Sequence, residues 1–123
     1  MKKVLVVDDS RLVRHQVSLA LRQAGIQITE AVDGVEGFAK VESEPDIGMV
    51  LCDVNMPNMG GLELLEKVKS SGTPAASLPF VMLTSESQQP LIDRARKAGA
   101  KGWVIKPFRA ELLVAAVRKL LPV

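Results

Sequence analysis

Five polar residues that could carry out phosphoryl transfer follow directly on short apolar stretches of the chain: Asp8 and Asp9, Asp53, Thr84, and Lys106. The aspartates would repel one another in a shared pocket, because two carboxylates about 5 Å apart repel by roughly 3 kcal/mol at an effective dielectric constant of about 20. Such a pocket requires a cation. Carboxylate and water oxygens are ligands that suit Mg²⁺, so the sequence predicts a magnesium site.

Asp53 is the nucleophile in this interpretation. Its carboxylate can form an acyl phosphate, while Mg²⁺ and the ammonium group of Lys106 would offset charge on the phosphoryl oxygens in the transition state. Thr84 would supply a hydroxyl donor. Catalysis of this kind depends mostly on positioning and electrostatics, so it requires that the chain bring these residues to one place.

The apolar pattern predicts five strands that alternate with five helices. The strands are expected over residues 3–7, 26–32, 47–52, 78–83 and 103–105, and the helices over 11–24, 35–41, 62–68, 90–99 and 111–121. Such alternation indicates a parallel sheet covered on both faces, with ligands bound beyond the carboxyl ends of the strands. If the first and third strands are neighbours, the three carboxylates converge. The second strand is expected at an edge, and Gly48 is expected to weaken the third.

Composition limits the function classes. The chain has 123 residues, 47% of them hydrophobic, and a net charge of +2, which is typical of one globular domain over 1–123 and gives no bulk case for nucleic acid or an anionic membrane. One cysteine, Cys52, cannot form an internal disulfide, and strand alternation predicts that it is a buried thiol pointing away from Asp53. We expect a cytoplasmic monomer with no membrane segment.

Four segments resemble, in order, the signatures of the response-regulator receiver family of two-component signalling: VLVVDDS, LCDVNMPNMGG, VMLTSES and KGWVIKPF. The resemblance covers essentially the whole chain and is strongest to the single-domain, CheY-like type. It implies a flavodoxin-like, doubly wound (βα)5 fold with a five-stranded parallel sheet in the order 2-1-3-4-5.

The resemblance also implies how the site would bind its metal and its phosphoryl group. Asp53 would accept the phosphoryl group, Asp9 and Asp53 would bind Mg²⁺ directly, Asp8 would act through a water molecule, and Asn55 would act through its backbone carbonyl. Asn55 and Glu86 stand at positions that tune the lifetime of the phosphoryl group in this family. Because both are hydrophilic and leave room for water, we expect a short lifetime.

Thr84 and Lys106 would bind the phosphoryl group by the same resemblance, and the Lys106–Pro107 peptide would be cis. Trp103 stands where the family usually has Tyr, Phe or His, an aromatic residue that swings inward as the threonine moves. Trp103 could act as this switch, or it could simply pack at the edge of the sheet. Ser85 stands where a small residue, often alanine, is expected.

The resemblance predicts a signalling switch rather than an enzyme, one that catalyses only its own phosphorylation and dephosphorylation. Its partners would be a histidine kinase or phosphotransfer protein and an output protein not identified by the sequence. Four basic residues surround the fourth helix and fifth strand and form either a solvated face or a docking surface for an acidic partner: Arg94, Lys97, Lys101 and Arg109. His15 is expected to be an exposed helix residue.

Three alternatives remain open at this point. The chain could be a receiver fragment of a larger regulator whose output domain is missing. It could be a Mg²⁺-dependent phosphohydrolase, although such enzymes generally place a second acid two residues after the nucleophile, where this chain has Asn55. It could also be an inactive receiver that serves only as a scaffold.

Overall fold

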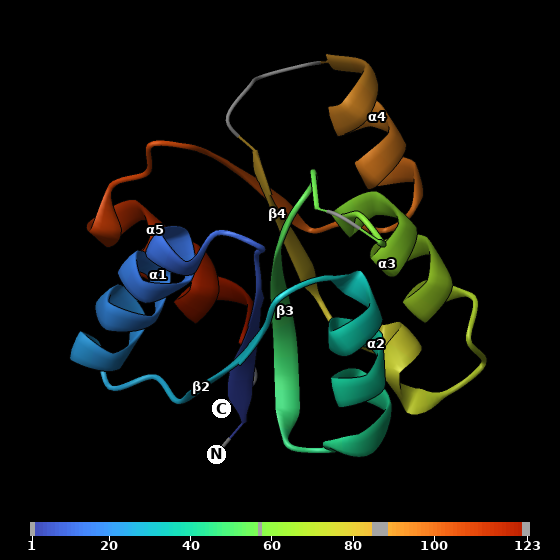
Figure 1. Ribbon diagram of the computed structural model, residues 1–123, viewed down its shortest axis with the longest axis horizontal. Helices are drawn as coiled ribbons and strands as arrows, with labels where there is room; N and C mark the ends of the chain where they lie inside the picture. Colours follow the sequence, from blue (N-terminus) through green and yellow to red (C-terminus); the bar gives the residue numbers. More distant parts are fainter. Residues whose placement is uncertain (1, 57, 85–88, 122–123) are drawn as a thin grey trace.

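The computed structural model describes residues 2–56, 58–84 and 89–121. Its five strands form one parallel sheet in the order β2-β1-β3-β4-β5, as the resemblance implied (Figure 1). The strands are β1 (Lys3–Val7), β2 (Ile28–Ala31), β3 (Ile47–Asp53), β4 (Phe80–Thr84) and β5 (Gly102–Ile105). The order confirms that the first and third strands are neighbours and that β2 lies at an edge.

Helices cover both faces of the sheet. They are α1 (Arg11–Gln23), α2 (Gly34–Ser43), α3 (Gly61–Lys69), α4 (Gln89–Lys97) and α5 (Ala110–Leu120), and a short 3₁₀ helix, η1, spans Pro74–Ser77. In Figure 1, α1 and α5 lie on one side of the sheet, and α2, α3 and α4 lie on the other. None of the helices in the described part of the chain is long and apolar enough to cross a membrane.

Alternation along the strands divides the core into two clusters. Leu5 and Val50 belong to the cluster under α2 and α3, whereas Val6 and Leu51 belong to the cluster under α1 and α5. Cys52 is fully buried in the first cluster. It therefore points away from the face that Asp53 shares by alternation with Met49 and Leu51, which confirms the predicted buried thiol.

The segment between α1 and β2 explains why the second strand is shorter than predicted. At the amino end of α1, Ser10 is the N-cap, and its Oγ accepts a hydrogen bond of 3.2 Å from the Val13 amide. The other end of the helix leads into β2. Gly25 ends the helix at a φ of 79°, and the Ile26 amide donates to the Leu21 carbonyl. This is a Schellman ending, so Ile26 belongs to the helix cap rather than to the strand.

Gly48 does not interrupt β3, which is buried throughout its length. The register between β1 and β3 shifts at this point, because Lys3 pairs with Ile47 and Val4 with Met49. A Cβ at Gly48 would lie 2.5 Å from Lys2 Cβ and 3.1 Å from Leu121 Cδ1. The glycine therefore marks a bulge over which the two ends of the described chain pack closely.

Candidate functional site

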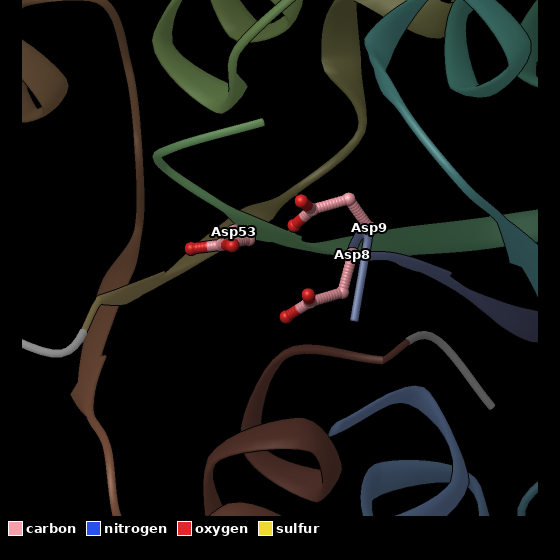
Figure 2. Close-up of side chains that lie close together, drawn as sticks. All are labelled: Asp8, Asp9 and Asp53. Atoms are coloured by element: carbon pink, nitrogen blue, oxygen red, sulfur yellow. The ribbon is translucent and has the colours of Figure 1, made fainter. Parts of the chain in front are cut away.

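Three aspartates gather at the carboxyl ends of β1 and β3. The two strands are neighbours, with Val7 paired to Cys52, so Asp8 and Asp53 leave the sheet side by side. Figure 2 shows these two side chains and that of Asp9 close together. One carboxylate oxygen from each of the three lies within 4.8 Å of the others. The predicted convergence of the acids is therefore present in the fold.

Lys106 brings a positive charge to the same place. Its Nζ lies 3.0 Å from Asp8 Oδ2 and 3.5 Å from Asp53 Oδ1. Its backbone amide donates a hydrogen bond of 2.6 Å to the Thr84 carbonyl, which ties the segment after β5 to the end of β4. The Lys106–Pro107 peptide is cis, as the resemblance implied.

Burial makes this group of charges costly. Asp8 is 0% exposed and Asp53 is 7% exposed, while Asp9 is open to solvent. Burial raises the pKa of Asp53, and the charge of Asp8 raises it further; Lys106 and the Asn55 amide act in the opposite direction.

The donor set fits a magnesium ion. Three carboxylates face one lysine among the described residues, so negative charge is left without a counterion. All the candidate ligand atoms are oxygens, and the exposed carboxylate of Asp9 gives access from solvent. Hard oxygen ligands and incomplete enclosure are typical of Mg²⁺ sites, which keep several waters.

Arg14, which sequence reasoning missed, holds the loop that carries Asp8. Its Nη1 donates 2.7 Å to the Asp8 carbonyl, and its Nε lies 3.2 Å from Glu30 Oε1 on β2. The Ser10 amide donates 2.9 Å to Asp8 Oδ1. Arg14 appeared in the sequence only as one of several basic residues of α1, and nothing in the spacing indicated that it turns inward.

The loop between β3 and α3 carries Asn55, the predicted backbone ligand. Asn55 is exposed, and its amide donates a hydrogen bond of 3.4 Å to Asp53 Oδ1. With Asp9, Met56 and Glu63 it lines a shallow hollow beside the acidic cluster. A side chain at Gly61 would clash with the Asp53 carbonyl, so this glycine lets α3 begin directly against Asp53.

Thr84 and Trp103, the predicted switch pair, lie on adjacent strands. Thr84 is 2% exposed and pairs with Ile105 at the end of β4, and Trp103 pairs with Met82. Trp103 is half-buried against the core cluster under α2 and α3. Its indole nitrogen is buried without a hydrogen-bond partner in the part of the chain that the structure describes. Ser85 and Glu86, for which roles were also predicted, lie outside the described residues.

The predicted basic surface is smaller than the sequence indicated. Arg94 is held by Glu66 of α3 through two contacts, of 2.8 Å and 3.1 Å, which lower the pKa of the Glu66 carboxyl. All four residues of the predicted set are exposed, and Lys97, Lys101 and Arg109 are those besides Arg94, whose charge is paired with Glu66. His15 is exposed on α1, as predicted.

Comparison of the sequence with known proteins identifies the family. The family model of the response regulator receiver domain matches residues 4–118. Chemotaxis protein CheY1 of Helicobacter pylori is 36% identical over 112 residues, which cover 90% of each chain. The chemotaxis protein CheY homolog of Campylobacter jejuni is 35% identical over 112 residues, covering 90% of this chain and 85% of that one.

Solved structures give the same result. Chemotaxis protein CheY4 of Vibrio cholerae has a TM-score of 0.91 at 36% identity, with 98% of this chain and 99% of that chain covered. A CheY-like receiver domain protein from Methanospirillum hungatei has a TM-score of 0.88 at 27% identity, with 97% and 92% covered. Sequence and fold thus point to one family along nearly the whole chain.

Proposed function

The chain belongs to the family of response regulator receiver domains, and on that basis we propose that it is a phosphorylation-dependent switch whose phosphoryl acceptor is Asp53. The observation that carries the proposal is the position of Lys106, which contacts both Asp8 and Asp53 where three carboxylates gather. An ion pair with a purely structural role needs only one acid. A lysine shared by two buried acids leaves an excess of negative charge, which suits a site that binds a metal cation.

The phosphoryl donor would be a phosphohistidine on a kinase or phosphotransfer protein. A carboxylate oxygen of Asp53 attacks the phosphorus, the new O–P bond forms as the P–N bond breaks, and the imidazole of the donor leaves and takes up a proton. Lys106 and the Thr84 hydroxyl bind the phosphoryl oxygens. Hydrolysis by water later restores the Asp53 carboxylate. Because Asn55 is hydrophilic and leaves room for water, the lifetime of the acyl phosphate would be short.

Magnesium would be held by the carboxylates of Asp9 and Asp53 and by the backbone carbonyl of Asn55, with Asp8 acting through water. When bound, Mg²⁺ offsets the charge that gathers on the phosphoryl oxygens during transfer. Its fit rests on the all-oxygen donor set and on the excess of negative charge around Asp53.

The output would pass through the face formed by α4, β5 and α5. Phosphorylation would shift an existing two-state equilibrium of Thr84, Trp103 and the neighbouring loops. The exposed cations Lys97, Lys101 and Arg109 suit an acidic partner protein on this face. We expect the protein to be a cytoplasmic monomer that does not bind nucleic acid directly.

The direct test is intact mass spectrometry after incubation with MgCl₂ and a small phosphodonor such as acetyl phosphate or phosphoramidate. The expected result is a gain of one phosphoryl group, which is lost in Asp53→Asn and on removal of Mg²⁺ with a chelator. Absence of any gain with both donors would overturn the proposal and favour an inactive receiver that serves as a scaffold.

A further inference from the structure

The loop after Asp53 is fastened to a part of the fold that the proposed chemistry does not use. Asn58, in the loop between β3 and α3, donates a hydrogen bond of 2.8 Å from Nδ2 to Asp33 Oδ2. Beside it, the Gly34 amide donates 3.0 Å to the Met59 carbonyl. Two consecutive loop residues are therefore bound to two consecutive residues at the start of α2.

Asp33 is a rigid anchor. It is the N-cap of α2, and its Oδ1 accepts a hydrogen bond of 2.9 Å from the Glu36 amide. Its two carboxylate oxygens thus divide between the helix and the loop, and both contacts lower the pKa of the Asp33 carboxyl. The Asp33 side chain is 9% exposed, whereas Asn58 is open to solvent, so the bond between them is shielded on the Asp33 side.

The loop side of the contact is specific as well. Asn58 has a φ of 67°, in the left-handed region that asparagine and aspartate tolerate better than other residues with side chains. Gly34 allows the loop to lie directly on the turn, because a Cβ there would be 2.6 Å from the Met59 carbonyl oxygen. The backbone conformation and the close approach both depend on the residue types present.

The described residues in the remainder of the loop make few polar contacts of their own. Its ends are fixed by bonds from the Val54 amide to the Leu83 carbonyl and from the Gly61 amide to the Val54 carbonyl. Between them, Asn55 is exposed, and its amide makes a long hydrogen bond of 3.4 Å to Asp53. Among the described residues, the loop beyond Asn55 is thus held by the packing of Met56 and Met59 on the core and by the polar contacts with Asp33 and Gly34.

We propose that Asp33 and Asn58 are positioning residues that pre-order the loop carrying Asn55 and so set the affinity of the site for Mg²⁺. This inference rests on the proposed function, since it takes the acidic cluster to be a magnesium site. Neither residue belongs to the candidate metal-binding group of Asp8, Asp9 and Asp53. Their bond removes conformational freedom that the loop would otherwise lose on binding, and a pre-ordered loop binds more tightly.

The test is a double-mutant cycle read by NMR titration of amide shifts with MgCl₂, which gives the dissociation constant. Asn58→Asp places two carboxylates together and breaks the bond, whereas Asp33→Asn alone keeps a bond, because the Asn58 amide can rotate to accept from the new amide group. The double variant exchanges donor and acceptor, so it restores the bond that Asn58→Asp breaks, with the net charge unchanged. We expect the cycle to show a coupling of about fivefold or more in Mg²⁺ affinity, the size of one ordinary hydrogen bond. Asn58→Gly, which keeps the left-handed backbone, should also bind Mg²⁺ more weakly.

Thr73→Ala is the matched control, because it removes a side-chain hydrogen bond of 3.2 Å to Glu42 beside η1, which precedes β4 at the other end of the sheet. Its Mg²⁺ affinity should equal that of the wild type even if its melting temperature falls. A cycle with no coupling, in a wild type that binds Mg²⁺, would overturn the positioning role alone. A wild type that does not bind Mg²⁺ would overturn the proposed function as well.

Discussion

Lys106 is bound more closely to Asp8 than to Asp53, with Nζ 3.0 Å from Oδ2 of the former and 3.5 Å from Oδ1 of the latter. Asp8 is the fully buried member of the pair, so it has the greater need of a counterion. The lysine therefore neutralises Asp8, and in the proposed function it would also remain near enough to Asp53 to meet a phosphoryl group there.

Replacing Lys106 with methionine should affect both roles. A buried carboxylate that loses its partner is costly, and because the lysine side chain is 18% exposed we expect the free energy of unfolding to fall by about 1–3 kcal/mol. Phosphorylation by a small phosphodonor should slow as well. Urea denaturation and the rate of mass gain measure the two effects. Lys101→Met, at an exposed lysine, should change stability by no more than about 0.5 kcal/mol; an equal loss there would contradict the pairing argument.

Asp53→Asn should stabilise the metal-free protein. Burial and the charge of Asp8 raise the pKa of Asp53, which means that at neutral pH its ionised carboxylate destabilises the folded state relative to the unfolded state. Removing that charge should raise the free energy of unfolding by on the order of 1 kcal/mol. Adding MgCl₂ should narrow the difference in free energy of unfolding between Asp53→Asn and the wild type, because the ion should stabilise the wild type more than the variant. Urea denaturation with and without Mg²⁺ tests this, and a less stable metal-free Asp53→Asn would contradict it.

Asp33 should make stability depend on pH in a defined direction. Its pKa is lowered from 3.8 by hydrogen bonds from the Glu36 amide and the Asn58 side chain. A carboxyl with a depressed folded-state pKa contributes stability that is present above the unfolded pKa and lost as the pH falls through the folded value. The difference in unfolding free energy between wild type and Asp33→Asn should therefore shrink below about pH 4. A constant difference from pH 7 to pH 3 would be the opposing result.

Trp103 offers an optical test of the switch, since it is the sole tryptophan. Its indole nitrogen is buried and has no hydrogen-bond partner in the described residues, so the ring would lose no such bond by moving. If Trp103 follows Thr84 on phosphorylation, its fluorescence emission should change on addition of Mg²⁺ and phosphodonor, and not in Asp53→Asn. Unchanged emission in a protein that mass spectrometry shows to be phosphorylated would leave Trp103 as a packing residue only.

The sequence predicted the elements well because they follow from hydrophobic periodicity. All five strands and five helices are present, with errors of a few residues at their ends. Those errors have local causes: Ile26 completes the cap of α1, and Leu78 bonds back to Ala75 at the end of η1, so neither joins its strand. The strand order came from the resemblance to receivers and could not have been taken from periodicity.

The acids and Lys106 were found because each stands at the end of an apolar run. The residues that hold the surrounding loops in place do not stand at the end of an apolar run. Arg14, Asn58 and Asp33 act through contacts between distant parts of the chain, and sequence spacing cannot show which polar side chain on a helix or turn will face inward. The only available signal is the Asp33-Gly34 pair, which is typical of a turn. The ion pair of Arg94 could not be predicted from spacing for the same reason, because its partner Glu66 lies on another helix.

The bulge at Gly48 has a consequence for how the chain can be rearranged. Because Lys2 and Leu121 both lie beside Gly48, the two ends of the described chain meet at the amino end of β3. Asp53 closes the opposite end of that strand, about 20 Å away at 3.3 Å per residue. A short linker could therefore join the ends in a circular permutant, with new termini opened in a surface loop, and leave the acidic cluster undisturbed.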